Sequence, residues 1–86
     1  MRLALTGAAG FICSNFVHYM ADKYPDYDFV LIDKLTYASG LRGYSWENVE
    51  FFRDDPRFRF VEADITDKQA MYDALYMCSA VINFAA

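Results

Sequence analysis

The sequence predicts an α/β fold that corresponds to the first part of a doubly wound parallel sheet. Short apolar runs alternate with segments of helical spacing, the first run ends in a glycine turn, and two later runs end in aspartate. Strands that alternate with helices favour a parallel sheet with right-handed crossovers. A chain of 86 residues forms one domain at most, so we expect residues 1–86 to be a single unit with a thin core.

The first unit is a strand, a glycine turn and a helix. Residues 3–6 are an apolar run that Gly7 stops, as expected of a strand buried on both faces. A helix is predicted over 11–24, where Pro25 ends it. The apolar stripe of this helix, which we expect to face the protein core, consists of Ile12, Phe16, Tyr19 and Met20.

Three further strands complete the predicted sheet, at 28–33, 58–64 and 80–84. The first two end in Asp33 and Asp64. Their predicted order along the sheet is 3-2-1-4, counting the strand at 3–6 as the first, and a flavodoxin-like order is the alternative.

The connections between these strands differ in character. The segment 34–57 is long and irregular, with a short helix expected around 46–52. Thr66 followed by Gln69 fits a capping box, which predicts a helix over 66–77.

The glycine turn has the features of an anion site. In a doubly wound sheet the ligand lies outside the carboxyl ends of the strands. Gly7 and Gly10 let the backbone approach a pyrophosphate, and the helix that begins near Phe11 directs N–H groups toward it. Cys13 takes the third position of the G-x-x-G-x-x-C pattern, which governs how closely helix and strand pack. A tight turn without a ligand is the alternative interpretation.

Asp33 makes a dinucleotide the favoured ligand. It follows Gly10 by 23 residues, close to the spacing of about 20 at which an acid binds the adenosine ribose hydroxyls. A carboxylate at that place repels a 2′-phosphate, so the sequence predicts NAD rather than NADP. The alternative is an exposed aspartate in a surface turn.

Composition excludes several classes of function. The net charge of −4 and the absence of a basic stripe argue against nucleic acid, and no apolar run reaches the roughly 20 residues that span a bilayer. Because the start of the chain has no secretion signal, we expect a cytoplasmic protein. Cys13 and Cys78 form no metal or redox motif and are expected to be buried, and His18 has no ligand cluster around it.

Four segments resemble the N-terminal part of the dTDP-glucose 4,6-dehydratases, which are extended short-chain dehydrogenases/reductases of the NAD-dependent epimerase/dehydratase group. These segments are TGAAGFICSNF (6–16), DKLTYASG (33–40), DDPRFRFVEADI (54–65) and NFAA (83–86). DKLTYA is the most specific of them. Plant-type rhamnose synthases share much of the pattern and remain an alternative, as do UDP-sugar epimerases and a non-catalytic nucleotide-binding fragment.

The resemblance implies NAD as cofactor and places its binding residues at the strand ends. It assigns the pyrophosphate to Gly7, Gly10, Phe11 and Ile12, the adenosine ribose and its surroundings to Asp33, Lys34, Leu35 and Thr36, the adenine to Asp64 and Ile65, and the nicotinamide half to Ala85 and Ala86. Asp64 can accept from an exocyclic amine, and Ile65 offers apolar contact. The alternative role of Asp64 is to cap the turn at Thr66.

For a complete protein the resemblance implies a lyase with a nucleotide-sugar substrate and a homodimeric assembly. Hydride leaves C4 of dTDP-glucose for NAD, water is eliminated across C5 and C6, and the hydride returns to C6. The family's catalytic Tyr-x-x-x-Lys and Asp-Glu pairs come after the segment that matches 83–86. We therefore expect no catalytic residue within 1–86, and weak NAD binding at most.

Two segments fall outside this expectation. Tyr19 and Lys23 match Tyr-x-x-x-Lys literally, but they follow the glycine turn directly, and the expected core-facing position of Tyr19 argues against catalysis. Residues 41–52 do not match the family pattern and are assigned no role.

Overall fold

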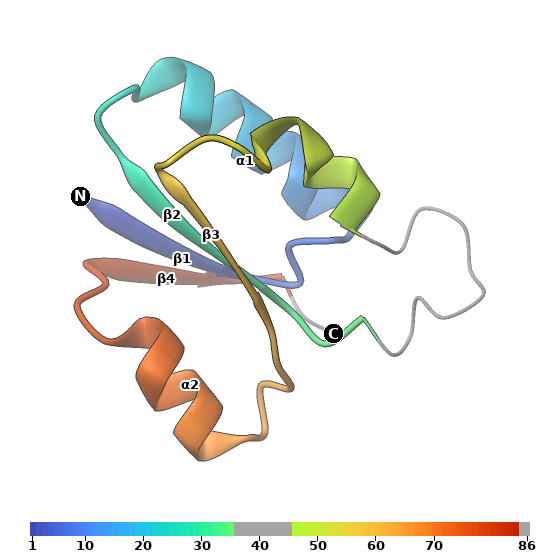
Figure 1. The fold of residues 1–86 in the computed structure, drawn as a ribbon, viewed down its shortest axis with the longest axis vertical. Coiled ribbons are helices and arrows are strands. Elements are labelled where there is room, and N and C mark those ends of the chain that lie inside the picture. The colour runs from blue at the N-terminus through green and yellow to red at the C-terminus, as the bar shows by residue number, and fades with distance from the viewer. Residues whose placement is uncertain (36–45, 85–86) are drawn as a thin grey trace.

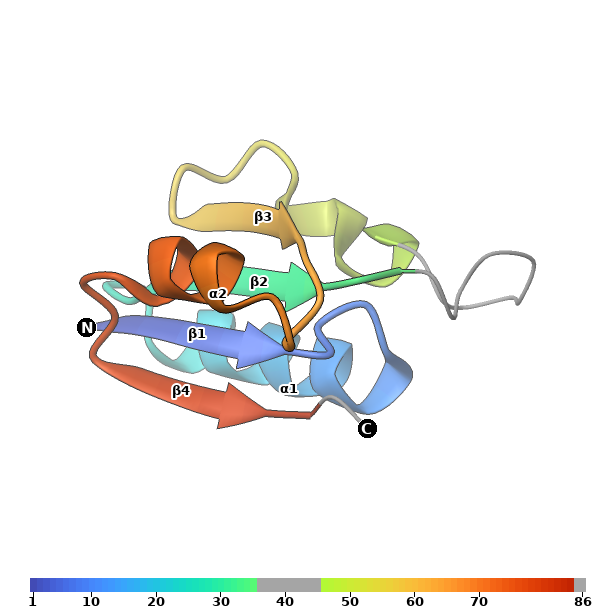
Figure 2. The same ribbon diagram turned by 90° about the horizontal axis from the view of Figure 1, so that it is seen from below.

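A four-stranded parallel sheet is the central layer of the computed structural model, which describes residues 1–35 and 46–84 (Figure 1). Its strands, in the order β3-β2-β1-β4, confirm the predicted 3-2-1-4 arrangement and exclude the flavodoxin-like one. They are β1 (Arg2–Thr6), β2 (Asp28–Asp33), β3 (Phe58–Glu62) and β4 (Ala80–Asn83). Figure 2 shows all four arrows pointing the same way, so the carboxyl ends of the strands lie at one edge of the sheet.

Helical segments cover both faces of this sheet (Figure 1). Helix α1 (Phe11–Lys23) and the 3-10 segment η2 (Trp46–Phe52) cover one face, and α2 (Lys68–Leu75) covers the other. The short helix expected around 46–52 is therefore present in 3-10 form.

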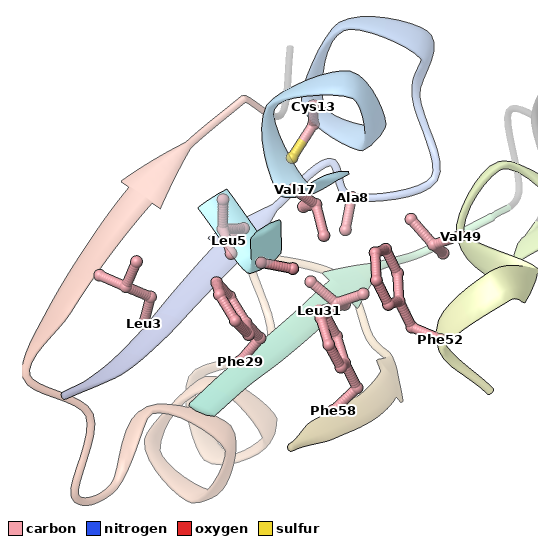
Figure 3. Close-up of a cluster of buried hydrophobic side chains, with 11 residues drawn as sticks. Leu3, Leu5, Ala8, Cys13, Val17, Phe29, Leu31, Val49, Phe52 and Phe58 are labelled. Atoms are coloured by element: carbon pink, nitrogen blue, oxygen red, sulfur yellow. The ribbon is translucent and has the colours of Figure 1, made fainter. Parts of the chain in front are cut away.

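The core is divided between the two faces because alternate residues of each strand point to opposite sides. Leu5 of β1 lies opposite Leu31 and Ile82 in the register, and all three belong to the larger cluster. Figure 3 shows this cluster, whose buried members are Leu3, Leu5, Ala8, Cys13, Val17, Ala21, Phe29, Leu31, Val49, Phe52 and Phe58. The smaller cluster under α2 is formed by Ala4, Val30, Ile32 and Ala74.

The buried face of α1 differs from the predicted one. Cys13, Val17 and Ala21, spaced four apart, face the sheet together with Ser14. Phe16 and Met20 pack at the border of the cluster, whereas Ile12 and Tyr19 are exposed. Small side chains occupy the centre because they let the helix approach the sheet closely, so the prediction that Ile12 and Tyr19 face the core is wrong.

The start of α2 also differs from the prediction. Asp67, and not Thr66, is the N-cap residue, and its side chain accepts a hydrogen bond from the backbone N–H of Ala70. Thr66 instead donates from its hydroxyl to Asp64, at 2.8 Å, so the capping box with Gln69 does not form. Aspartate accepts as readily as threonine at an N-cap, and the hydroxyl of Thr66 is already bound to Asp64.

Arg57, the residue before β3, donates hydrogen bonds at the C-terminal end of α1. Its guanidinium donates to the backbone carbonyls of Ala21 and Pro25, at 3.3 and 3.1 Å, and pairs with Asp55. The same group lies over the ring of Phe58, 5.4 Å from its centre. One carbonyl of the last turn of α1, that of Ala21, thus accepts from a charged donor.

Candidate functional site

The glycine turn between β1 and α1 leaves backbone donors directed at the carboxyl edge of the sheet. Gly7 has a φ of 73°, which a side chain would disfavour, and the N–H of Gly10 donates to the Gly7 carbonyl at 3.1 Å. Gly10 is the N-cap of α1 and offers no capping side chain. The first N–H groups of α1 therefore have no partner within the helix, and the positive end of its dipole lies beside them.

The N-termini of the two α-helices differ in how they are capped. Helix α2 is closed by the carboxylate of Asp67, whereas α1 has neither a capping side chain nor an acid in its first turn. The side chains of Phe11 and Ile12 are 75% and 72% exposed. Among the described residues no capping side chain closes the start of α1, which leaves its N–H groups as potential donors to an anion.

Asp33 lies beside this turn and is buried, with only 8% of its surface exposed. One carboxylate oxygen, Oδ2, accepts from the backbone N–H of Ala9, and the other, Oδ1, accepts from that of Leu35, both at 2.9 Å. The alternative of an exposed aspartate in a surface turn is therefore wrong. Each carboxylate oxygen has two acceptor positions, so Asp33 keeps capacity for two further donors such as the hydroxyls of a ribose.

Leu35 is held in an unusual conformation by the same carboxylate. Its φ of 61° lies in the left-handed region, which costs a residue with a Cβ about 1–2 kcal/mol. The hydrogen bond from its N–H to Asp33 offsets this strain. Asp33 thus joins the end of β2 to both the glycine turn and the start of the next segment.

Lys34 and Asp64 form an ion pair at the neighbouring strand ends, with 3.6 Å between Nζ and Oδ2. Asp64 also accepts from the backbone N–H and the hydroxyl of Thr66, and these bonds, with a smaller contribution from Lys34, lower the pKa of its carboxyl. Asp64 therefore does cap the turn at Thr66, the alternative role considered above. Ile65 is 41% exposed beside it.

The structure brings most of the predicted site residues to one edge of the sheet. The Ala9–Asp33 hydrogen bond joins the glycine turn to the end of β2, and the Lys34–Asp64 pair joins β2 to the segment after β3. Nine of the twelve predicted residues lie along this edge, namely Gly7, Gly10, Phe11, Ile12, Asp33, Lys34, Leu35, Asp64 and Ile65. Thr36, Ala85 and Ala86 lie outside the described residues.

Sequence reasoning missed Asn48, which lies in the segment 41–52 that was assigned no role. Its side-chain Nδ2 donates to the carbonyl of Ala9 at 2.7 Å. No local pattern signals this contact, because the two residues are 39 apart in the sequence.

Tyr19 and Lys23 lie away from this edge. The ammonium of Lys23 donates to the Tyr19 hydroxyl at 3.2 Å, and this bond raises the pKa of Lys23. Tyr19 is 57% exposed and stands eight residues into α1, about 12 Å along its axis. The pair therefore has the spacing of a catalytic motif without access to the strand ends.

The part of the chain that the structure describes contains neither a metal-binding cluster nor a membrane-spanning helix. Within residues 1–35 and 46–84, no three histidine, cysteine or acidic side chains gather as they would around a metal ion. The helices in these ranges are also too short and too polar to cross a membrane.

The sequence and the fold match known proteins along nearly the whole chain. A protein-family model described as GDP-mannose 4,6 dehydratase matches residues 5–86. The dTDP-glucose 4,6-dehydratase of Mycobacterium tuberculosis is 41% identical over 86 residues, which are 100% of this chain and 24% of that enzyme. The trifunctional UDP-glucose 4,6-dehydratase/UDP-4-keto-6-deoxy-D-glucose 3,5-epimerase/UDP-4-keto-L-rhamnose-reductase RHM3 of Arabidopsis thaliana is 41% identical over 87 residues, 99% of this chain and 12% of that protein.

A solved structure agrees with these matches. The crystal structure of dTDP-glucose 4,6-dehydratase from Bacillus anthracis in complex with NAD superposes with a TM-score of 0.86 at 35% identity, covering 100% of this chain and 27% of that one. The chain thus spans about a quarter of that solved structure. With the family model matched over residues 5–86, the chain belongs to the GDP-mannose 4,6-dehydratase family of NAD-dependent nucleotide-sugar epimerases and dehydratases.

Proposed function

We propose that residues 1–86 are the N-terminal, NAD-binding part of a nucleotide-sugar 4,6-dehydratase that acts on dTDP-glucose. The observation that carries the proposal is the position of Asp33, whose buried carboxylate is bonded to the backbone of the glycine turn. A ribose acceptor and an anion-binding helix end are thereby held side by side. That arrangement suits the adenosine and pyrophosphate parts of one dinucleotide.

NAD is the proposed form of the cofactor. Asp33 is an acid with two acceptor oxygens, which suits the two free hydroxyls of the NAD ribose and disfavours a phosphate on the 2′ position. In this assignment Thr36, Ala85 and Ala86 also contact the cofactor.

The proposed reaction belongs to the complete protein. When bound, NAD would supply the hydride acceptor for a cycle in which hydride leaves C4 of the hexose, water is eliminated across C5 and C6, and hydride returns to C6 as a proton returns to C5. Residues 1–86 bind and orient the cofactor for this cycle, and the groups that move protons lie elsewhere in the complete protein. Support comes from the relatives described as dTDP-glucose 4,6-dehydratases and from the DKLTYA segment at 33–38.

A UDP-glucose 4,6-dehydratase of the rhamnose-synthase type is the second candidate. The Arabidopsis relative is as similar to this chain as the mycobacterial one, at 41% identity. The two candidates differ in the nucleotide that carries the sugar.

The experiment is a turnover assay on a protein that contains these 86 residues and the remaining length of the family. Incubated with dTDP-glucose and a trace of NAD, it is expected to form a product lighter by one water, with no accumulation of NADH. A clear preference for UDP-glucose would favour the second candidate. A product of unchanged mass, as an epimerase makes, would refute both. Turnover by the isolated 86-residue chain would refute the assignment of residues 1–86 to cofactor binding only.

A further inference from the structure

The backbone of Ala9 is held at both of its polar groups. Its N–H donates to Oδ2 of Asp33 at 2.9 Å, and its carbonyl accepts from Nδ2 of Asn48 at 2.7 Å. Ala9 is fully buried and lies between Gly7 and Gly10 in the glycine turn. One acid and one amide from distant segments therefore help to orient the two peptide groups on either side of Ala9. The N–H of the second peptide group, that of Gly10, adds a local bond to the Gly7 carbonyl at 3.1 Å.

Asn48 is itself firmly placed. The next residue, Val49, is fully buried, and the ring of Phe52 stacks on that of Phe58 with 4.2 Å between centres. Figure 3 shows Val49 and Phe52 reaching from η2 into the cluster that α1 covers. The backbone carbonyl of Asn48 also lies 3.3 Å from Nε2 of His18 on α1. Because η2 is anchored to both the sheet and the helix, Asn48 can hold the glycine turn without moving.

The direction of the Ala9 carbonyl matters for an anion. A carbonyl oxygen carries negative charge, and here it points toward Asn48 in η2. If the Ala9–Gly10 peptide rotated, this oxygen could face the region where the N–H groups at the start of α1 attract a pyrophosphate. Gly10 would permit such a rotation, because glycine tolerates backbone angles closed to other residues.

We propose that Asn48 is a positioning residue for the dinucleotide, which holds the Ala9 carbonyl away from the pyrophosphate and keeps the glycine turn in its binding conformation. The inference rests on the proposed function, because it concerns the same NAD site. It assigns a role to the segment 46–52, which contacts the ligand through the turn and not directly.

The test compares two variants of the full chain with the wild type and a matched control. Asn48→Asp keeps the size of the side chain but replaces the donor with an acceptor that faces the Ala9 carbonyl, and Asn48→Ala removes the side chain. Glu50→Gln is the control, since Glu50 lies in the same segment and pairs only with the exposed Arg53 at 3.0 Å among the contacts described. Amide hydrogen exchange at Ala9 and NMR titrations with NAD and with adenosine are measured for each protein.

We expect both Asn48 variants to exchange the Ala9 amide faster than the wild type and to bind NAD roughly three- to tenfold more weakly, the effect of losing one net hydrogen bond. Adenosine should bind all four proteins equally, because it has no pyrophosphate and its acceptor, Asp33, is retained. Glu50→Gln should match the wild type in every measurement. A general loss of structure would instead weaken NAD and adenosine together.

Several results would overturn the inference. Wild-type NAD affinity or unchanged Ala9 exchange in both Asn48 variants would show that the amide does not position the turn. An equal loss of NAD and adenosine affinity would assign Asn48 a purely structural role. A wild type that binds neither ligand would refute NAD binding by residues 1–86 and remove the basis for the inference, and this outcome is recognised without any variant.

Discussion

Replacing Asp33 with asparagine removes one of the two acceptors that join β2 to the glycine turn. The carbonyl oxygen of the asparagine can accept from only one side, so its NH₂ group then faces the N–H of either Ala9 or Leu35. Because Asp33 is 8% exposed, water cannot readily satisfy the donor that is left. An unsatisfied buried donor costs about 1–3 kcal/mol, and the remaining bond loses the strengthening that a charged acceptor gives.

We therefore expect Asp33→Asn to lower the free energy of unfolding by about 2–3 kcal/mol. The loss is a large share of the roughly 4–13 kcal/mol expected for a chain of this length. Urea unfolding followed by circular dichroism at neutral pH measures the difference. Asp28→Asn, the same change at the exposed first residue of β2, is the control and should stay within about 0.5 kcal/mol of wild type. If Asp33→Asn were as stable as this control, the carboxylate would not hold the turn and the account of the site would fail.

Three further outcomes can be checked on the same chain. Burial, with a smaller contribution from the charge of Asp33, raises the pKa of the Cys13 thiol from 9.0 to about 12. Between these two pH values the folded state keeps the thiol proton and the unfolded state loses it. The unfolding free energy of wild type should therefore fall relative to that of Cys13→Ala as the pH rises from about 9 toward 12. Arg57→Met should lower the unfolding free energy by about 2 kcal/mol by removing the charged donor at the end of α1, whereas Arg53→Met, at an exposed pair, should change it by less than about 1 kcal/mol; urea unfolding measures both. Asp67→Ala should lower it by about 1 kcal/mol as the observed cap of α2 is lost, and a larger loss in Thr66→Ala would instead support the capping box that the sequence suggested.

The architecture and the main site residues could be predicted because their signals are local. Apolar runs that end in glycine or aspartate place strands and their carboxyl ends, and parallel topology then brings those ends to one edge. Gly7 and Asp33 were identified from spacing alone, and the structure places them in one hydrogen-bonded arrangement through Ala9. The predicted strand order is that of the first part of a doubly wound sheet, and the structure confirms it.

Which face of α1 is buried could not be predicted from hydrophobicity. Ile12 and Tyr19 are more apolar or larger than Ala21, yet the helix turns its small residues to the sheet because close packing there excludes bulk. Sequence periodicity reports where apolar residues recur and carries no information on how near two elements approach.

The contacts of Asn48 and Arg57 could not be predicted because they join segments far apart in the sequence. Asn48 reaches Ala9 across 39 residues and Arg57 reaches Ala21 across 36. Asn48 lies outside the segments that resemble the family and Arg57 lies inside one of them, 54–65. Both bind backbone carbonyls, which every residue possesses, so neither segment indicates the partner. Such contacts depend on the packed arrangement of η2, α1 and β3 and become visible only when the elements are assembled.

An NMR titration of the 86-residue chain with NAD tests the central claim most directly. The account predicts saturable shifts of the backbone amide signals of Gly7, Gly10, Ile12, Asp33 and Ile65, with a Kd near or above about 1 mM, which corresponds to roughly 4 kcal/mol. NADP should produce the same shifts only at higher concentration, because Asp33 repels its 2′-phosphate. Signals that do not move at about ten times that concentration, or NADP that binds as tightly as NAD, would contradict the account.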